Sequence, residues 1–297
     1  MKTAFSLLLL LFCAPALAAV NVFACEPEWA ALAREIGGDK VKTFAATTAF
    51  QDPHHIEARP SLIARIRNAD LLICSGSELE IGWLPLLLTQ GGNNRIQPGS
   101  PGYLEASQYV IKLEVPRVVD RSLGDVHPGG NPHIQTDPRN IARVAAALGE
   151  RLAALDPGNA ALYRQKENEF QGRWQAAIAR WQSQAARLKG VPLLEHHKGF
   201  TYLIAWLGMR EVGDLEPKPG VPPTTEHLAE LVEQMQRAPA KMIVYSSYDD
   251  PRAAEFLAKR TGIPAVMLPF TVGGSDRAKD LFGYFDDLVA RLLAPLQ

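Results

Sequence analysis

Short apolar runs typical of strands alternate with amphipathic helical patterns along both halves of this chain. The strand candidates are residues 20–25, 40–45, 70–74, 110–115, 191–195, 241–245 and 265–268. The helix candidates are residues 28–36, 61–68, 81–88, 139–155, 200–207, 225–236, 253–261 and 279–293. Such alternation favours mostly parallel sheets covered by helices, so the sequence predicts an α/β fold.

A single long helical pattern, residues 159–188, separates the two halves. Apolar residues form one stripe along it at three- and four-residue spacing: Tyr163, Phe170, Trp174, Ile178, Trp181, Ala185 and Leu188. At 1.5 Å per residue, this helix would be about 45 Å long, more than the diameter of a small domain. An ordinary surface helix is the alternative. We predict a linker helix over 157–189 that joins an N-terminal α/β lobe, 19–156, to a C-terminal α/β lobe, 190–297.

The first 18 residues have the order of features found in an export signal. Lys2 supplies a positive charge, residues 5–13 are apolar, and Ala16-Leu17-Ala18 is a small-x-small cleavage site. The apolar run is too short to span a bilayer. Phe12 does not fit a lipid-attachment motif before Cys13. We therefore expect cleavage near Ala18 and an exported, periplasmic protein; a buried first strand or helix is the alternative.

Charge and cysteine content restrict the possible partners and the redox state. Lys and Arg number 31 against 32 Asp and Glu, without a basic stripe of the kind that binds nucleic acid. Cys25 and Cys74 remain after signal cleavage, and an oxidising compartment permits a disulfide between them. Two buried thiols at strand ends are the alternative.

Three histidines and one aspartate occupy four short loop segments spread over both halves. These segments are Asp52 to Ser61 with His54, Asn131 to Pro138 with His133, His197 to Tyr202, and Gly273 to Asp276. Imidazole nitrogen and carboxylate oxygen are ligands that a borderline cation such as zinc accepts. Ligands from distant segments meet only in the assembled fold. The pattern therefore predicts a metal held in a cleft, with His54, His133, His197 and Asp276 as ligands.

Several neighbouring side chains have more than one interpretation. His55 and His196 adjoin predicted ligands, but only His54 and His197 keep register with the motifs. His127, in a loop rich in Gly and Pro, is either a secondary metal-capture ligand or a solvated side chain. Four carboxylates could orient the imidazoles or simply shape turns: Asp52, Glu57, Asp137 and Glu195.

Taken in this order, the four motifs resemble the periplasmic zinc/manganese solute-binding proteins of ABC transporters, the linker-helix (cluster A-I) class. The resemblance covers essentially the whole mature chain. It implies two α/β lobes, a spanning helix and a metal held between the lobes. It also implies delivery of that metal to a membrane permease with a cytoplasmic ATPase, and we expect a monomer. Two features depart from the family pattern: the loop at 122–130 is short, and Gln135 replaces an aromatic residue.

The third motif bears on the choice of metal. In this family that position is His in zinc proteins and commonly Glu in manganese proteins, and here it is His197. Three imidazoles and one carboxylate make a nitrogen-rich site suited to Zn²⁺, whereas Mn²⁺ prefers oxygen ligands. We therefore expect Zn²⁺ as the transported ligand, with a manganese-binding member of the same family as the alternative.

Two other function classes are less consistent with the sequence. A zinc-dependent hydrolase would need an open metal position and a general base. The chain has neither a His-Glu-x-x-His helix nor a Gly-x-Ser-x-Gly elbow, and only Glu195 beside His196 suggests a base. A pocket for an organic or siderophore-type ligand would be mainly apolar and aromatic. We therefore expect a binding protein and not an enzyme.

Overall fold

The computed structural model of this protein describes residues 19–120, 122 and 124–297. The predicted export signal, residues 1–18, lies outside the described part of the chain. Within that part, no helix is both long enough and apolar enough to cross a membrane.

The first lobe is built on a four-stranded parallel sheet with the order β2-β1-β3-β4. Its strands are β1 (Val20–Ala24), β2 (Val41–Ala45), β3 (Leu71–Cys74) and β4 (Tyr103–Glu105). Its helices are α1 (Pro27–Gly37), α2 (Pro60–Arg67), α3 (Leu84–Gly91) and α4 (Pro138–Leu155). One sheet face packs against α1 and α4, and the other against α2 and α3. Because both faces are covered, β3 is apolar throughout.

The second lobe repeats this arrangement with the strand order β6-β5-β7-β8, again all parallel. Its strands are β5 (Pro192–Glu195), β6 (Arg210–Asp214), β7 (Met242–Ser246) and β8 (Ala265–Leu268). Its helices are α6 (Thr201–Leu207), α7 (Thr225–Arg237), α8 (Arg252–Thr261) and α9 (Leu281–Leu293). Helices α6 and α9 cover one face, while α7 and α8 cover the other.

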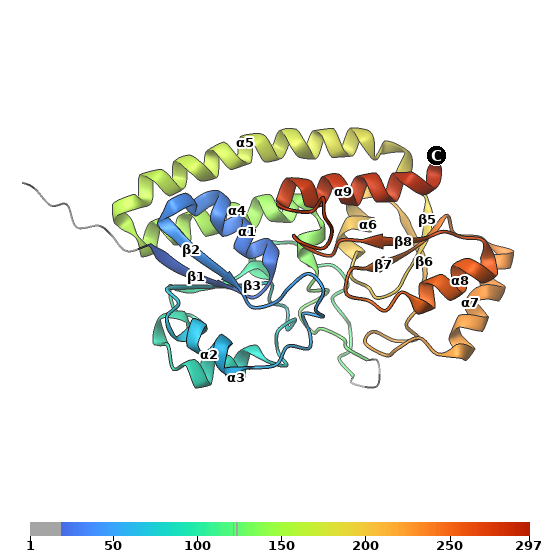
Figure 1. The fold of residues 1–297 in the computed structure, drawn as a ribbon, viewed down its shortest axis with the longest axis horizontal. Coiled ribbons are helices and arrows are strands. Elements are labelled where there is room, and N and C mark those ends of the chain that lie inside the picture. The colour runs from blue at the N-terminus through green and yellow to red at the C-terminus, as the bar shows by residue number, and fades with distance from the viewer. Residues whose placement is uncertain (1–18, 121, 123) are drawn as a thin grey trace, which may run out of the picture.

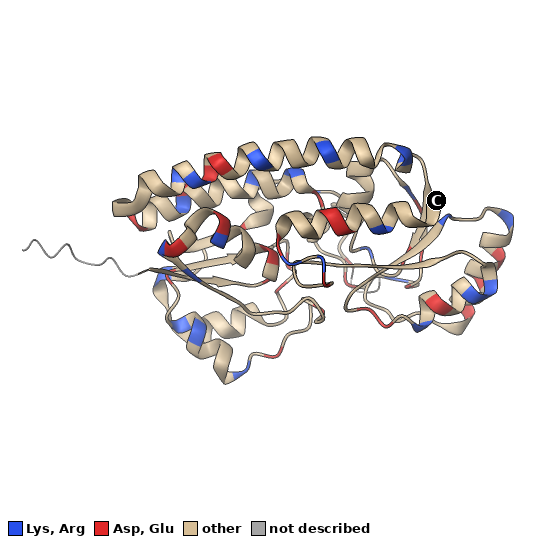
Figure 2. Cartoon of the chain, turned by 45° about the horizontal axis from the view of Figure 1, so that its top comes forward, with Lys and Arg blue, Asp and Glu red and all other residues tan. Residues whose placement is uncertain are grey.

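Helix α5 (Ala160–Gln184) lies along both lobes (Figure 1). Its 25 residues span about 37 Å, and a short 3₁₀ turn, Ala186–Leu188, follows it. The Trp174 indole N–H donates to the carbonyl of Pro138 in the first lobe, at 2.7 Å. The Trp181 indole N–H donates to Asp286 on α9 in the second lobe, at 2.6 Å. Lys and Arg are intermixed with Asp and Glu on the outer side of this helix (Figure 2). The predicted α/β fold, two parallel-sheet lobes joined by a long helix, is confirmed.

The predicted strand at residues 110–115 was wrong. This segment has no sheet partner, because β4 already occupies the edge beside β3. The N–H of Leu113 instead donates to the hydroxyl of Tyr202 on α6, and its carbonyl accepts from the N–H of Asn131. Strands β4 and β6 were not predicted. Strand β6 is a half-exposed edge that contains Gly213 and charged residues, so it lacks an apolar run.

Cys25 and Cys74 lie at the carboxyl ends of the neighbouring strands β1 and β3. Their Cα atoms are 4.8 Å apart, and a disulfide joins them across 49 residues of sequence. Both side chains are buried between the sheet and α2 and α3.

Candidate metal centre

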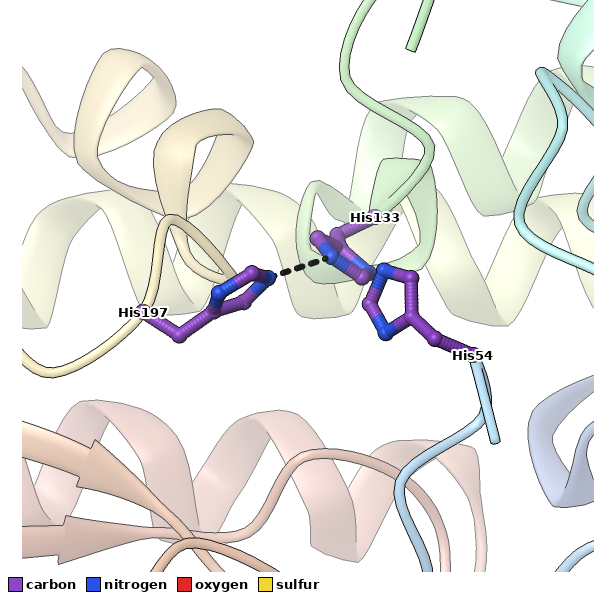
Figure 3. Close-up of side chains that lie close together, drawn as sticks. All are labelled: His54, His133 and His197. Atoms are coloured by element: carbon purple, nitrogen blue, oxygen red, sulfur yellow. Dashed lines mark hydrogen bonds between the residues drawn. The ribbon is translucent and has the colours of Figure 1, made fainter. Parts of the chain in front are cut away.

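The structure brings three histidines from distant segments to one place between the lobes (Figure 3). His54 lies in the loop between β2 and α2, His133 immediately before the 3₁₀ turn that leads into α4, and His197 in the loop after β5. One ring nitrogen from each lies within 4.8 Å of the other two. The Nε2 atoms of His133 and His197 are 3.4 Å apart. Such a spacing allows one cation to contact all three imidazoles.

Hydrogen bonds from backbone N–H groups to nearby side chains fix the loop conformation at two of these histidines. The Asp52 carboxylate accepts the N–H of His54 at 2.9 Å. The Asn131 amide oxygen accepts the N–H of His133 at 3.0 Å. Short polar side chains before a turn commonly form such bonds, which here set the direction of the two loops.

Two carboxylates orient two of the imidazoles. Asp52 is 2.7 Å from Nδ1 of His54, and Glu216 is 2.8 Å from Nδ1 of His197. Glu216 is itself fixed, because it accepts the N–H of Gly220 at 2.8 Å. A carboxylate on Nδ1 leaves Nε2 available as a metal ligand. The Nε2 of His54 is buried and has no hydrogen-bond partner.

The surrounding charges act differently on the three rings. Burial lowers the pKa of His133 well below its usual value, and the charges of the neighbouring histidines lower it further. Burial also lowers the pKa of His197. The hydrogen bond and charge of Glu216, together with Asp249 and Asp52, outweigh burial and leave that pKa raised. His133 is therefore held neutral, as a ligand must be, while the carboxylates around His197 favour a positive charge at this place.

The other predicted ligand, Asp276, is not part of this cluster. It is exposed in the loop before α9, and the group of histidines within 4.8 Å does not include it. The neighbouring Ser275 is anchored through its hydroxyl to Asp287 at 2.6 Å, and the N–H of Gly273 donates to the carbonyl of Ala278. This anchored turn leaves Asp276 facing solvent.

His127 lies next to the cluster. Its ring centre is 5.4 Å from that of His54, and its Nε2 is buried without a hydrogen-bond partner. Together with His133 and His197 it lines a cavity of about 220 Å³. Burial, with the nearby charges of His54 and His197, lowers the pKa of His127 to about 4.

The remaining candidates have other roles or positions. His55 is exposed, and His196 lines a different cavity, of about 540 Å³, in the second lobe. Asp137 caps α4 and pairs with Arg139 at 2.6 Å. Glu195 is buried and accepts the N–H of Phe200. Glu57 is exposed.

Sequence reasoning missed Glu216, which follows the unpredicted strand β6. One feature of the sequence could have indicated Glu216. It lies shortly after Asp214, at the carboxyl end of a strand, where α/β sheets position functional residues.

Known proteins resemble this chain over most of its length. The family model described as zinc-uptake complex component A, periplasmic, matches residues 22–293. The high-affinity zinc uptake system protein ZnuA of Bacillus subtilis is 22% identical over 258 residues, covering 85% of this chain and 79% of the relative. The manganese ABC transporter substrate-binding lipoprotein PsaA of Streptococcus pneumoniae is 22% identical over 259 residues, covering 86% and 81%.

Another relative is longer than this chain. The zinc-binding lipoprotein AdcA of Streptococcus pneumoniae is 21% identical over 239 residues, which are 79% of this chain, and the match spans only 46% of AdcA.

Solved structures share the fold. A crystal structure of ZnuA has a TM-score of 0.75 at 19% identity, and covers 92% of this chain and 99% of its own. The Mn-bound periplasmic metal-binding protein from Candidatus Liberibacter asiaticus has a TM-score of 0.76 at 17% identity, with coverage of 94% and 100%. Because the family model extends over nearly all of the described residues, the chain belongs to the family of periplasmic zinc-uptake component A proteins.

Proposed function

We propose that this protein is a periplasmic solute-binding protein that captures Zn²⁺ between its lobes and delivers it to an ABC-type importer. The observation that carries this proposal is the convergence of His54, His133 and His197 from both lobes within 4.8 Å. Three imidazole nitrogens that the fold brings together form a site that Zn²⁺ occupies readily.

Two residues compete for the fourth position of the site. Asp276 is the carboxylate that the sequence motif predicts, but it lies exposed in its loop. His127 has a buried, unpartnered Nε2, and its ring centre is 5.4 Å from that of His54. The geometry favours His127 as this ligand or as a capture ligand on the way to the site.

The chemistry of the ligands supports Zn²⁺ over Mn²⁺. Relatives include proteins named for each metal. Mn²⁺ favours carboxylate, carbonyl and water oxygens, whereas imidazole suits Zn²⁺. Nitrogen atoms dominate here, and the two nearest carboxylates bind ring N–H groups.

Membership of the family also suggests partners and location. The family is one of transport components and not an enzyme family, and we infer that this chain binds and releases its metal without catalysis. A membrane permease with its cytoplasmic ATPase would receive the metal from a monomer. Residues 1–18 would direct export and be removed near Ala18.

A zinc titration of metal-stripped protein, with Mn²⁺ as competitor, tests the proposal. We expect one tight Zn²⁺ per chain that excess Mn²⁺ does not displace. Replacing His54, His133 or His197 with Ala should weaken zinc binding strongly, whereas His55→Ala and His196→Ala serve as matched controls with mild effects. Comparing His127→Ala with Asp276→Asn identifies the fourth ligand. Absence of tight zinc binding would refute the proposed function.

A further inference from the structure

The side chain of Asn131 bridges the two lobes beside the three clustered histidines. Asn131 belongs to the first lobe and is 7% exposed. Its Nδ2 donates to the carbonyl of Lys198, in the second lobe, at 2.7 Å and to the carboxylate of Glu114 at 2.9 Å. The hydroxyl of Thr201, also in the second lobe, lies 3.2 Å from the same Nδ2 and donates to Glu114 at 3.1 Å. One buried amide therefore connects both lobes.

The two ends of this amide have different partners. Oδ1 accepts the N–H of His133 at 3.0 Å, whereas Nδ2 faces three oxygen atoms. The reverse orientation would place the amide NH₂ against the N–H of His133 and the amide oxygen against a carbonyl and a carboxylate, so these partners decide which end is which. The oxygen end therefore shapes the loop of His133, and the nitrogen end attaches it to Lys198, the residue that follows His197.

Further contacts hold the same junction. The buried hydroxyl of Tyr202 donates to the carbonyl of Asn131 at 2.8 Å and accepts the N–H of Leu113 at 3.1 Å. Glu114 has a φ of 52°, a backbone conformation that residues other than glycine rarely adopt, and Nζ of Lys198 lies 3.4 Å from its carboxylate. Such a conformation persists only where the surroundings hold it. The residues of this inter-lobe latch are Glu114, Asn131, Lys198, Thr201 and Tyr202.

We propose that the inter-lobe latch positions His197 against His133, with Asn131 as the central positioning residue; this inference rests on the zinc site proposed above. The Nε2 atoms of the two histidines are 3.4 Å apart. Ligands at two corners of a tetrahedron, each about 2.0–2.1 Å from Zn²⁺, would be about 3.3–3.4 Å apart. The latch therefore holds one edge of a zinc tetrahedron across the boundary between the lobes. A preset edge lowers the cost of ordering the two lobes when zinc binds.

Asn131→Ser separates the two ends of the amide. Serine keeps an oxygen that can accept the N–H of His133, but it is too short to donate to Lys198. Competition with a chelator should show zinc affinity about tenfold below that of the wild type, the lower end of the usual range for groups that orient metal ligands. Tyr202→Phe removes one hydroxyl and no charge. It should also lower zinc affinity, and it keeps the test decisive if Asn131→Ser does not fold.

Asn93 provides a matched control for the change at Asn131. It is 8% exposed, and its Oδ1 accepts the N–H of Arg95, two residues further on, at 3.1 Å. Its Nδ2 donates to the carbonyls of Ile66 and Ala69, so all these partners lie in the first lobe. Asn93→Ser should therefore lower stability in urea and leave zinc affinity unchanged. An equal loss of zinc affinity in Asn93→Ser would mean that the latch variants act through general stability, and would overturn the proposal.

A double-mutant cycle separates positioning of His197 from a local effect on the loop of His133. In a His197→Ala background, the remaining clustered imidazoles, His54 and His133, both belong to the first lobe. The latch then has no ligand of the second lobe to position, so Asn131→Ser should cause little further loss of zinc affinity, whereas independent effects would add. Full additivity would contradict the proposal. So would wild-type zinc affinity in both Asn131→Ser and Tyr202→Phe.

Hydrogen exchange in metal-free protein distinguishes failure of the latch from failure of the proposed function. Both latch variants should exchange faster than the wild type in residues 130–136 and 196–202, and Asn93→Ser should not. A wild type that binds no zinc would refute the proposed function, while faster exchange in these two segments would still support the connection between the lobes. Unchanged exchange in both latch variants would overturn the latch whether or not zinc binds.

Discussion

At the scale of single residues, the three clustered imidazoles differ in what supports them. His54 and His197 each have a carboxylate at Nδ1, whereas Nδ1 of His133 is buried without a partner. The position of His133 depends instead on Asn131, which accepts its N–H, and on the cap that Asp137 forms on α4. Carboxylates therefore orient the rings of His54 and His197, whereas the conformation of the backbone positions the ring of His133.

The first prediction concerns Glu216. Replacing it with Gln keeps an acceptor for Nδ1 of His197 but removes the negative charge. We expect zinc affinity to fall about tenfold, and towards a hundredfold for Glu216→Ala, the usual range for such supporting carboxylates. Competition with a chelator of known affinity measures the change, and Glu211→Gln is the control of equal charge. Unchanged affinity in both Glu216 variants would contradict the assigned role.

The second prediction concerns stability and pH. Burial raises the pKa of Glu28 from 4.5 to about 7, with the charge of Glu80 adding to the effect and the Thr271 hydrogen bond opposing it. The folded protein therefore holds a proton that the unfolded chain releases above about pH 4.5. This contribution to stability is complete below pH 4.5 and is lost as the pH rises through about 7.

Urea unfolding of metal-free wild type and Glu28→Gln at pH 5, 6, 7 and 8 checks this. The variant cannot ionise here, so the difference between the two proteins isolates Glu28 from the histidines. From pH 5 to 7 the wild type should lose stability relative to the variant, by at most about 1.4 kcal/mol per pH unit. A difference that does not change with pH would show that Glu28 does not hold this proton.

The site could be predicted from sequence only where its residues lie in recognisable motifs. His54, His133 and His197 lie in loops with Pro or Gly close by, so their convergence followed from the α/β pattern and the family resemblance. Glu216 belongs to no motif, and its contact with His197 depends on pairing between β5 and β6. The predicted role of Asp276 depends on the path of an irregular loop, which hydrophobic periodicity does not specify.

At the scale of elements, the buried central strands could be recognised in the sequence, and the exposed edge strands could not. Strands β3 and β7 are central and apolar, so their runs stand out in the sequence. Strand β4 has only three residues, and β6 is a polar edge. Residues 110–115 include four apolar side chains, yet Ile111 is 73% exposed and Val115 56% exposed. Apolar composition therefore indicated a strand where no sheet edge was free.

The third prediction concerns Gly172 in the interior of α5. Glycine there lowers helix stability, and a Cβ added at this exposed position would meet no atom within 4 Å. Gly172→Ala should therefore stabilise the protein by about 0.5–1 kcal/mol, through helix propensity and a less flexible unfolded chain. Urea unfolding measures the gain. Zinc affinity should not change, and a loss of stability would mean that α5 needs flexibility at this point.

At the scale of the whole molecule, α5 and the cluster of His54, His133 and His197 involve the same two lobes at different places. The buried face of α5 contacts α1 and α4 of the first lobe and α9 of the second. Trp174 and Trp181 anchor its two halves to different lobes by hydrogen bonds. The histidines also come from both lobes, since His197 alone belongs to the second. The core is therefore continuous through α5, and the lobes should unfold together.

Native-state hydrogen exchange resolved by mass spectrometry tests this last prediction. Amides of β3 in the first lobe and β7 in the second should report the same free energy of opening in metal-free protein, because α5 shares its core with both. The proposed zinc site exists only in the assembled fold, so zinc at a hundred times its dissociation constant should raise both values equally, by about 2.7 kcal/mol. His55→Ala should keep this gain and His197→Ala should lose it in both lobes. Protection by zinc that is confined to the lobe of β3 would mean that the second lobe opens independently, and that His197 does not bind the metal strongly enough to couple them.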